Sequence, residues 1–80
     1  MDIRQVFASN LRRARTNAGM SQEELAFAAD LDRGYISSLE RGIYGASIDV
    51  VARVAEVLGL EASELLQKPK RSRPPNGIKR

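Results

Sequence analysis

Residues 21–42, SQEELAFAADLDRGYISSLERG, contain two short helical patterns with a few turn-favouring residues between them. Ser21 and Glu24 form a predicted capping box, because the serine hydroxyl can accept from the Glu24 amide while the carboxylate accepts from the Ser21 amide. A helix therefore begins after Ser21. Asp30 tolerates a left-handed backbone, and Asp32 can cap the next helix. The stretch predicts two short helices joined by about three residues, as in an αα-corner or a helix-turn-helix.

The second of these helices, from residue 33 to about residue 41, has an exposed face of unusual composition. Its buried edge is predicted to hold Ile36, Leu39 and part of Tyr35. The side away from that edge holds short or basic side chains: Arg33, Gly34, Ser37, Ser38 and Arg41. Because glycine costs about 1 kcal/mol relative to alanine in a helix, helix stability does not account for this face. Short side chains flanked by arginines suit a close approach to the major groove of DNA, and a plain solvated face is the alternative.

Helical patterns flank this stretch on both sides. Residues 2–17 form one apolar stripe and precede Gly19, which suits the end of a helix. Ser47 can cap a further helix that ends at Gly59, and a last helical turn or two is expected at about residues 62–67. The two stripes hold Ile3, Val6, Phe7, Leu11 and Ala14 in the first helix and Ile48, Val51, Val54, Ala55 and Leu58 in the fourth. We therefore predict an all-α fold of five short helices without a strand.

Charge divides the chain into two regions. Residues 1–67 carry seven arginines against all ten acidic side chains, a net charge of −3, whereas residues 68–80 carry six lysines and arginines and no acid, a net charge of +6. The whole chain has a net charge of +3. The second region also contains Pro69, Pro74 and Pro75 and has too few apolar groups to order itself. We predict one domain over residues 1–67 and a disordered basic tail over residues 68–80. The tail either contacts DNA or merely adds solubility.

The composition also limits the chemistry of the protein. The chain has no cysteine and no histidine, so a disulfide framework and the usual zinc and haem ligands are excluded. No glycine-rich phosphate loop follows a strand, and we expect no enzymatic activity, no metal, no cofactor and no small-molecule ligand. The sequence lacks both a membrane-spanning apolar run and a leader at Met1, so we expect a cytoplasmic protein that does not bind membranes.

Residues 7 to about 66 resemble the helix-turn-helix domain of the phage repressor, Cro and Xre family. The resemblance is carried by LRRARTNAGMSQEELAFAADLDRGYISSLERG at residues 11–42 and by SIDVVARVAEVLGL at residues 47–60. Within that family the chain looks most like the small controller proteins of restriction–modification systems. The resemblance implies a compact five-helix repressor-like domain that dimerises and regulates transcription. Such a dimer binds a pseudo-palindromic DNA operator with its recognition helix, here about residues 33–41, in the major groove.

The resemblance also implies roles for individual residues. Base contacts are expected from Arg33, Gly34, Ser37 and Ser38, with Arg33 as the leading base reader. Contacts to phosphates are expected from Arg12, Arg15, Ser21, Gln22, Tyr35, Arg41 and Tyr44. Tyr35 alternatively packs its ring against the preceding helix, and for Tyr44 we favour a role in covering the fourth helix. The sequence departs from the family pattern at Asp30, where glycine is usual, and at Ala46, where proline is frequent.

The family pattern further pairs an arginine of the first helix with a glutamate at the end of the recognition helix. The matching residues are Arg15 and Glu40, which we predict to form a salt bridge that orients the recognition helix. Its net effect on stability is small if desolvation of the two charges offsets their attraction. Two separate surface charges are the alternative.

Apolar side chains in the last two helices predict a dimer. The predicted core comprises Val6, Phe7, Leu11, Met20, Leu25, Ala26, Leu31, Ile36, Leu39, Val51, Val54, Ala55 and Leu58. One small domain cannot entirely bury the apolar residues that remain: Val50, Val57, Leu60, Leu65 and Leu66. A self-complementary patch explains them, so we predict a two-fold homodimer whose recognition helices lie about 34 Å apart. An antitoxin-like protein-interaction module with the same fold is the alternative function.

Overall fold

The computed structural model describes residues 2–68, which contain four α-helices and one short 3₁₀ helix joined by loops. Their bounds are α1 Ile3–Asn17, α2 Gln22–Ala28, α3 Arg33–Glu40, α4 Ile48–Leu58 and the 3₁₀ helix η1 Ala62–Leu66. The described residues contain no strand, so the predicted all-α class and order of helices are confirmed. From residue 69 onward, the predicted disordered tail lies outside the described residues. None of the helices within residues 2–68 is long and apolar enough to cross a membrane.

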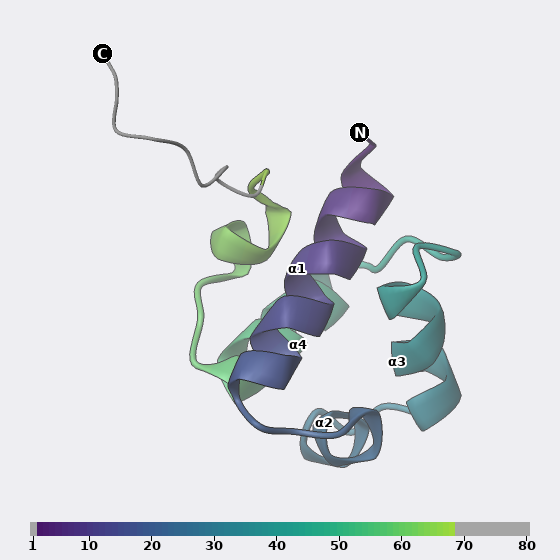
Figure 1. Ribbon diagram of the computed structural model, residues 1–80, viewed down its shortest axis with the longest axis vertical. Helices are drawn as coiled ribbons and strands as arrows, with labels where there is room; N and C mark the ends of the chain where they lie inside the picture. Colours follow the sequence, from purple (N-terminus) through teal and green to yellow (C-terminus); the bar gives the residue numbers. More distant parts are fainter. Residues whose placement is uncertain (1, 69–80) are drawn as a thin grey trace.

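The helices are arranged around α1. Figure 1 shows α3 on one side of α1, η1 on the other, α4 behind it and α2 at its C-terminal end. Contacts join α1 to both α3 and η1, and α2 to α3. The exposed side of α3 therefore faces away from the body of the molecule.

Short side chains at the helix starts explain these boundaries. The capping box of Ser21 and Glu24 forms, with the serine hydroxyl 3.0 Å from the Glu24 amide nitrogen and the carboxylate 2.8 Å from the Ser21 amide nitrogen. Asp32 accepts from the Gly34 amide at 2.8 Å, and Ser47 caps α4. Asp30 has a φ of 59°, the left-handed conformation predicted for the turn between α2 and α3. These local predictions are confirmed.

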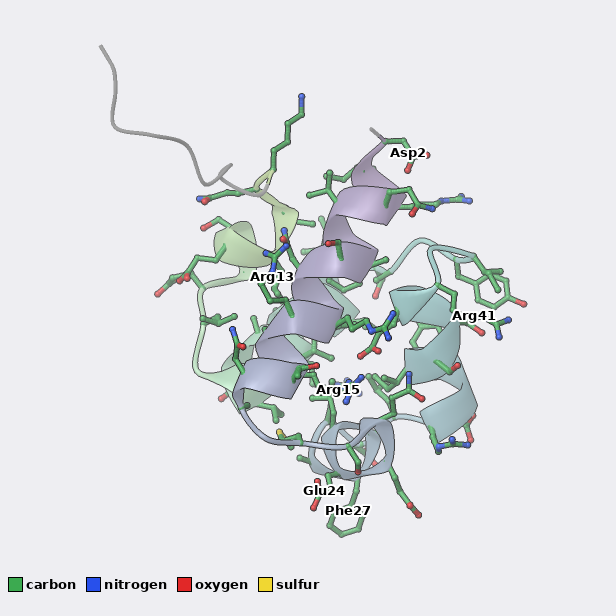
Figure 2. The ribbon with its side chains drawn as sticks, in the orientation of Figure 1. Asp2, Arg13, Arg15, Glu24, Phe27 and Arg41 are labelled. Carbon is green, nitrogen blue, oxygen red and sulfur yellow. The ribbon has the colours of Figure 1, made fainter. Side chains whose placement is uncertain are left out.

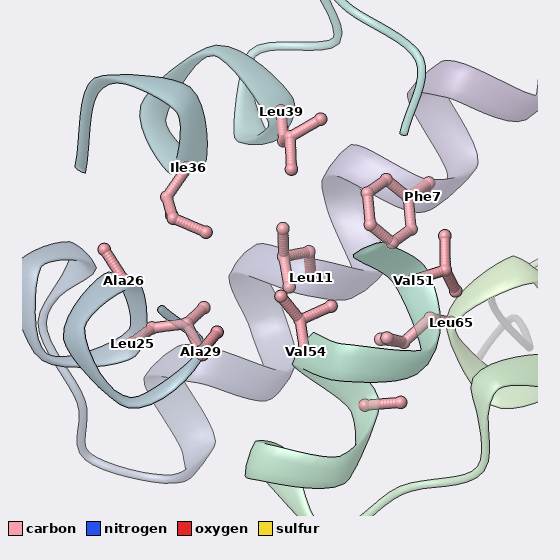
Figure 3. Close-up of a cluster of buried hydrophobic side chains, with 11 residues drawn as sticks. Phe7, Leu11, Leu25, Ala26, Ala29, Ile36, Leu39, Val51, Val54 and Leu65 are labelled. Atoms are coloured by element: carbon pink, nitrogen blue, oxygen red, sulfur yellow. The ribbon is translucent and has the colours of Figure 1, made fainter. Parts of the chain in front are cut away.

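The core lies between all five segments. Figure 3 shows Leu11 of α1 among side chains from the other helices, including Ile36, Leu39 and Val54. Most of the predicted core is buried, but Met20, Leu31 and Leu58 are only half-buried, because they pack at its edge. Ala8 and Ala29, which were not predicted, are buried.

Three apolar residues differ from their predicted environment. Ile3 and Ile48 were placed on buried stripes, yet they are 57% and 86% exposed. Each is the first residue of its helix. Leu65 was predicted to lie in a dimer interface, but it is 1% exposed and belongs to the core. The reason is a tertiary contact: the Asn10 side-chain amide donates to the Leu65 carbonyl at 2.9 Å and to the Gln67 carbonyl at 2.7 Å, which holds η1 against α1.

Candidate nucleic-acid interface

The helix α3 combines an anchored inner edge with an exposed outer face. Ile36 and Leu39 are fully buried, so the orientation of the helix about its axis is fixed. On the other side Arg33 and Gly34 are exposed, while Ser37 and Ser38 are half-buried. These are the four predicted base-contacting residues, and α3 brings them together on one face.

Gly34 has a structural explanation that the sequence did not suggest. A Cβ atom at this position would lie 2.9 Å from Oδ2 of Asp32, the carboxylate oxygen that accepts from the Gly34 amide. A contact below 3.0 Å requires a shift, and the group that would shift is the end of the Asp32 side chain, whose carboxylate caps α3. Glycine is thus favoured by the start of the helix as well as by any close approach to DNA.

A charged network fixes α3 against α1. Arg15 donates from Nε to Glu40 Oε2 at 2.6 Å and from Nη2 to Oε1 at 3.0 Å, a two-pronged ion pair. The Glu40 side chain is 3% exposed and that of Arg15 is 15% exposed. The hydrogen bond to Glu40 raises the pKa of Arg15, against the opposing effect of desolvation. Figure 2 shows Arg15 between α1 and α3, so the predicted pair is present.

Gln22 is a third member of this network, and this contact was not predicted from the sequence. Its side-chain amide donates to Glu40 Oε1 at 3.1 Å. Arg15 also donates from Nη1 to the Met20 carbonyl at 2.8 Å, just before α2 begins. Glu40 therefore links the start of α2, the C-terminal half of α1 and the last residue of α3. Gln22 and Glu40 are 18 residues apart, so no helical spacing connects them.

The remaining predicted phosphate-contacting residues are distributed around α3. Arg41 is exposed at the C-terminal end of α3 (Figure 2). Tyr44, in the following loop, is 54% exposed. Arg12 and Glu40 both line an open groove along the polar side of α1. Ser21 is exposed at the start of α2. Tyr35 is half-buried and packs against the core.

Comparison with known proteins places this geometry in a family. Residues 11–65 match the family model described as helix-turn-helix. The chain is 43% identical over 68 residues to a hypothetical transcription factor of Neisseria meningitidis, and the match covers 85% of this chain and 64% of that protein. The crystal structure of the Neisseria factor superposes on this chain with a TM-score of 0.82, and the superposition covers 85% of this chain and 78% of the chain in that structure. The chain thus spans less than two thirds of that curated relative.

Two further structures are similar. The restriction–modification controller protein C.AhdI from Aeromonas hydrophila is 40% identical, with a TM-score of 0.75 over 78% of this chain and 94% of that one. The biofilm regulator SinR, crystallised in complex with DNA, is 31% identical, with a TM-score of 0.74 over 76% of this chain and 98% of that one. The chain therefore belongs to the Xre-type helix-turn-helix family, and its predicted likeness to restriction–modification controller proteins is confirmed.

Proposed function

We propose that the protein is a transcriptional regulator that binds a pseudo-palindromic DNA operator as a homodimer, with α3 in the major groove. The observation that carries this proposal is the construction of α3, which is held by buried Ile36, Leu39 and Glu40 while Arg33 and Gly34 stay exposed. A helix that reads bases needs a fixed axis and free side chains at the same time. The relatives named above include a regulator solved with DNA, which supports the same function.

Arg33 is the proposed reader of a base. It is exposed and is the first residue of α3, the end that contacts base edges in helix-turn-helix proteins. A guanidinium can donate to guanine O6 and N7 together, and the neighbouring Gly34, Ser37 and Ser38 are short enough to allow the approach. The amino-terminal half of α3 thereby supplies the sequence preference.

Phosphate contacts are proposed to position α3 without reading sequence. The residues are Arg12, Arg15, Ser21, Gln22, Tyr35, Arg41 and Tyr44. Arg15 uses three of its five N–H groups on Glu40 and the Met20 carbonyl, which leaves two for a phosphate. Ser21 accepts through its oxygen at the start of α2, so its hydroxyl hydrogen stays available. Gln22 likewise donates one amide hydrogen to Glu40 and keeps the other.

Selection of bound DNA from a random pool tests this function. The wild-type protein should enrich a motif with two-fold symmetry. Arg33→Ala should lose the preference at one position in each half of that motif, with a cost of about 1–3 kcal/mol against the preferred base. Arg13→Ala is the matched control, because Arg13 is an exposed arginine of α1 outside the proposed contact set, donates to Asn10 within the same helix and lies towards η1 in Figure 2.

Two outcomes would contradict parts of the proposal. If Arg33→Ala weakens binding equally for all sequences and leaves the motif unchanged, Arg33 contacts a phosphate and not a base. If the wild-type protein enriches no motif at all, operator recognition by this chain is wrong.

A further inference from the structure

An apolar surface lies where the first residues of α1 and α4 meet the end of η1. Ile48 is 86% exposed, Ile3 is 57% exposed and Leu66 is 41% exposed. Next to them is a groove of about 140 Å³, whose lining includes Ile3, Phe7, Ala46, Val51 and Leu66. A protruding apolar side chain thus stands beside an apolar recess in the same small region.

We infer that this surface joins two copies of the chain, with Ile48 of each copy seated in the groove of the other. The inference rests on the proposed function and deepens it, because it names the surface through which the dimer forms. A two-fold interface uses one patch twice, so the patch must contain both halves of each contact. A protein cavity of about 150 Å³ accepts a benzene molecule, so a groove of about 140 Å³ accepts the butyl group of isoleucine.

The charges around the patch favour a second copy over an unrelated partner. Arg4 lines the groove, and Asp49 directly follows Ile48 and is exposed. Because Arg4 lines the groove and Asp49 adjoins Ile48 in the chain, we expect Asp49 to approach Arg4 of the other copy when Ile48 enters that groove. The two-fold axis would generate this opposite-charge contact twice, so the surface supplies both members of the apolar contact and both members of the charge pair.

This surface differs from the dimer interface predicted from the sequence. Val50, Val57 and Leu60 pack against the core, and Leu65 is inside it, whereas Leu66 lines the groove. The contact that we infer lies at the N-terminal end of α4. The groove also includes Gly45 and Ala46, in the loop that leads from α3 to α4. Because this loop follows the C-terminal end of α3, dimerisation through the groove would fix the distance between the two α3 helices at those ends.

Sedimentation velocity of the full chain without DNA tests the inference. Ile48→Ala should raise the dissociation constant of the dimer at least about tenfold, because each interface loses two buried side chains. Phe27→Ala is the matched control, since Phe27 is 88% exposed and projects from α2, at the end of the molecule away from Asp2 (Figure 2). Both side chains are exposed in the single chain, so thermal unfolding monitored by circular dichroism should show both variants folded.

Charge reversal gives a second, independent measurement. Arg4→Glu and Asp49→Arg should each weaken the dimer about fivefold, and the double variant should return to within about twofold of the wild type. Asp49 lies in the first turn of α4, where an arginine is unfavourable to the helix itself. Recovery in the double variant therefore separates contact between copies from a loss of helix stability, which the second substitution cannot repair.

The outcomes distinguish this inference from the proposed function. If the wild-type protein dimerises and Ile48→Ala dimerises equally well, the surface is wrong and operator binding by a dimer stands. The same holds if Ile78→Ser, in the C-terminal tail, dissociates the dimer and Ile48→Ala does not. A wild-type chain that stays monomeric at 100 µM overturns both the surface and the dimer, while nuclease protection still reports DNA binding.

Discussion

The two sides of α1 are joined to their neighbours by different chemistry. Towards α3 the joint is ionic, with Arg15 and Glu40 bonded at 2.6 and 3.0 Å and Gln22 added at 3.1 Å. Towards η1 the joint is neutral, with Asn10 donating to two backbone carbonyls at 2.9 and 2.7 Å. Figure 1 shows these two neighbours on opposite sides of α1. The element that we propose to read DNA is thus the one held by charge.

The comparison implies different costs for breaking the two joints. A buried charge that loses its partner keeps the full penalty of desolvation, whereas removal of the Asn10 amide leaves two uncharged carbonyls without a donor, which costs less. The ionic joint also fixes two proposed phosphate contacts, Arg15 and Gln22, in place. Its loss should therefore affect stability and DNA binding together, while loss of the neutral joint should affect mainly stability.

Glu40→Ala should have the largest effect. It leaves the partly buried guanidinium of Arg15 without its ion-pair partner and frees Gln22, so we expect a loss of about 3–5 kcal/mol in the free energy of unfolding, measured with urea. Glu56→Ala, which removes an exposed carboxylate of α4, should stay within about 0.5 kcal/mol of the wild type. Replacing Arg15 and Glu40 together by Met and Leu should recover much of the loss. Equal effects of Glu40→Ala and Glu56→Ala would show that the ion pair does not hold α3.

Asn10→Ala should have an intermediate effect. The Leu65 and Gln67 carbonyls lose their donor, so we expect a loss of about 1–3 kcal/mol in the free energy of unfolding. Hydrogen exchange should accelerate in η1 more than in α3. Asn17→Ala, at the exposed end of α1, is the control with the same change of side chain. Slow exchange in η1 of the Asn10→Ala variant would mean that burial of Leu65 alone holds this segment.

Prediction from the sequence succeeds for residues that interact with close neighbours in the chain and fails more often for partners that are far apart in the chain. The caps by Ser21, Asp32 and Ser47 and the left-handed Asp30 involve residues at most three positions apart, and all four were predicted. The joints of α1 span 25 residues to Glu40 and 55 to Leu65. The first was predicted through a family resemblance and the second was missed.

Burial of apolar residues shows the same limit. Periodicity identifies the inner stripe of a helix but not how far neighbouring segments extend along it. Ile3 and Ile48 therefore lie in line with the buried apolar stripes of α1 and α4, but they are exposed because each is the first residue of its helix. At the candidate site, helical spacing correctly predicted that Arg33 and Gly34 lie on the exposed face of α3, because two fully buried residues leave a short helix little freedom of rotation.

Gly34→Ala should have the smallest effect on stability, and it separates the two explanations of this glycine. Alanine should gain about 1 kcal/mol from helix propensity, and crowding of its Cβ against Asp32 Oδ2 should cancel that gain. Asp32→Ala removes both the cap and the crowding, so in that background Gly34→Ala should stabilise α3 by about 1 kcal/mol. A gain of the same size in both backgrounds would mean that the cap tolerates a side chain. In that case, the affinity for the selected DNA shows whether close approach to DNA requires Gly34. If it does, Gly34→Ala weakens specific binding although it stabilises the helix.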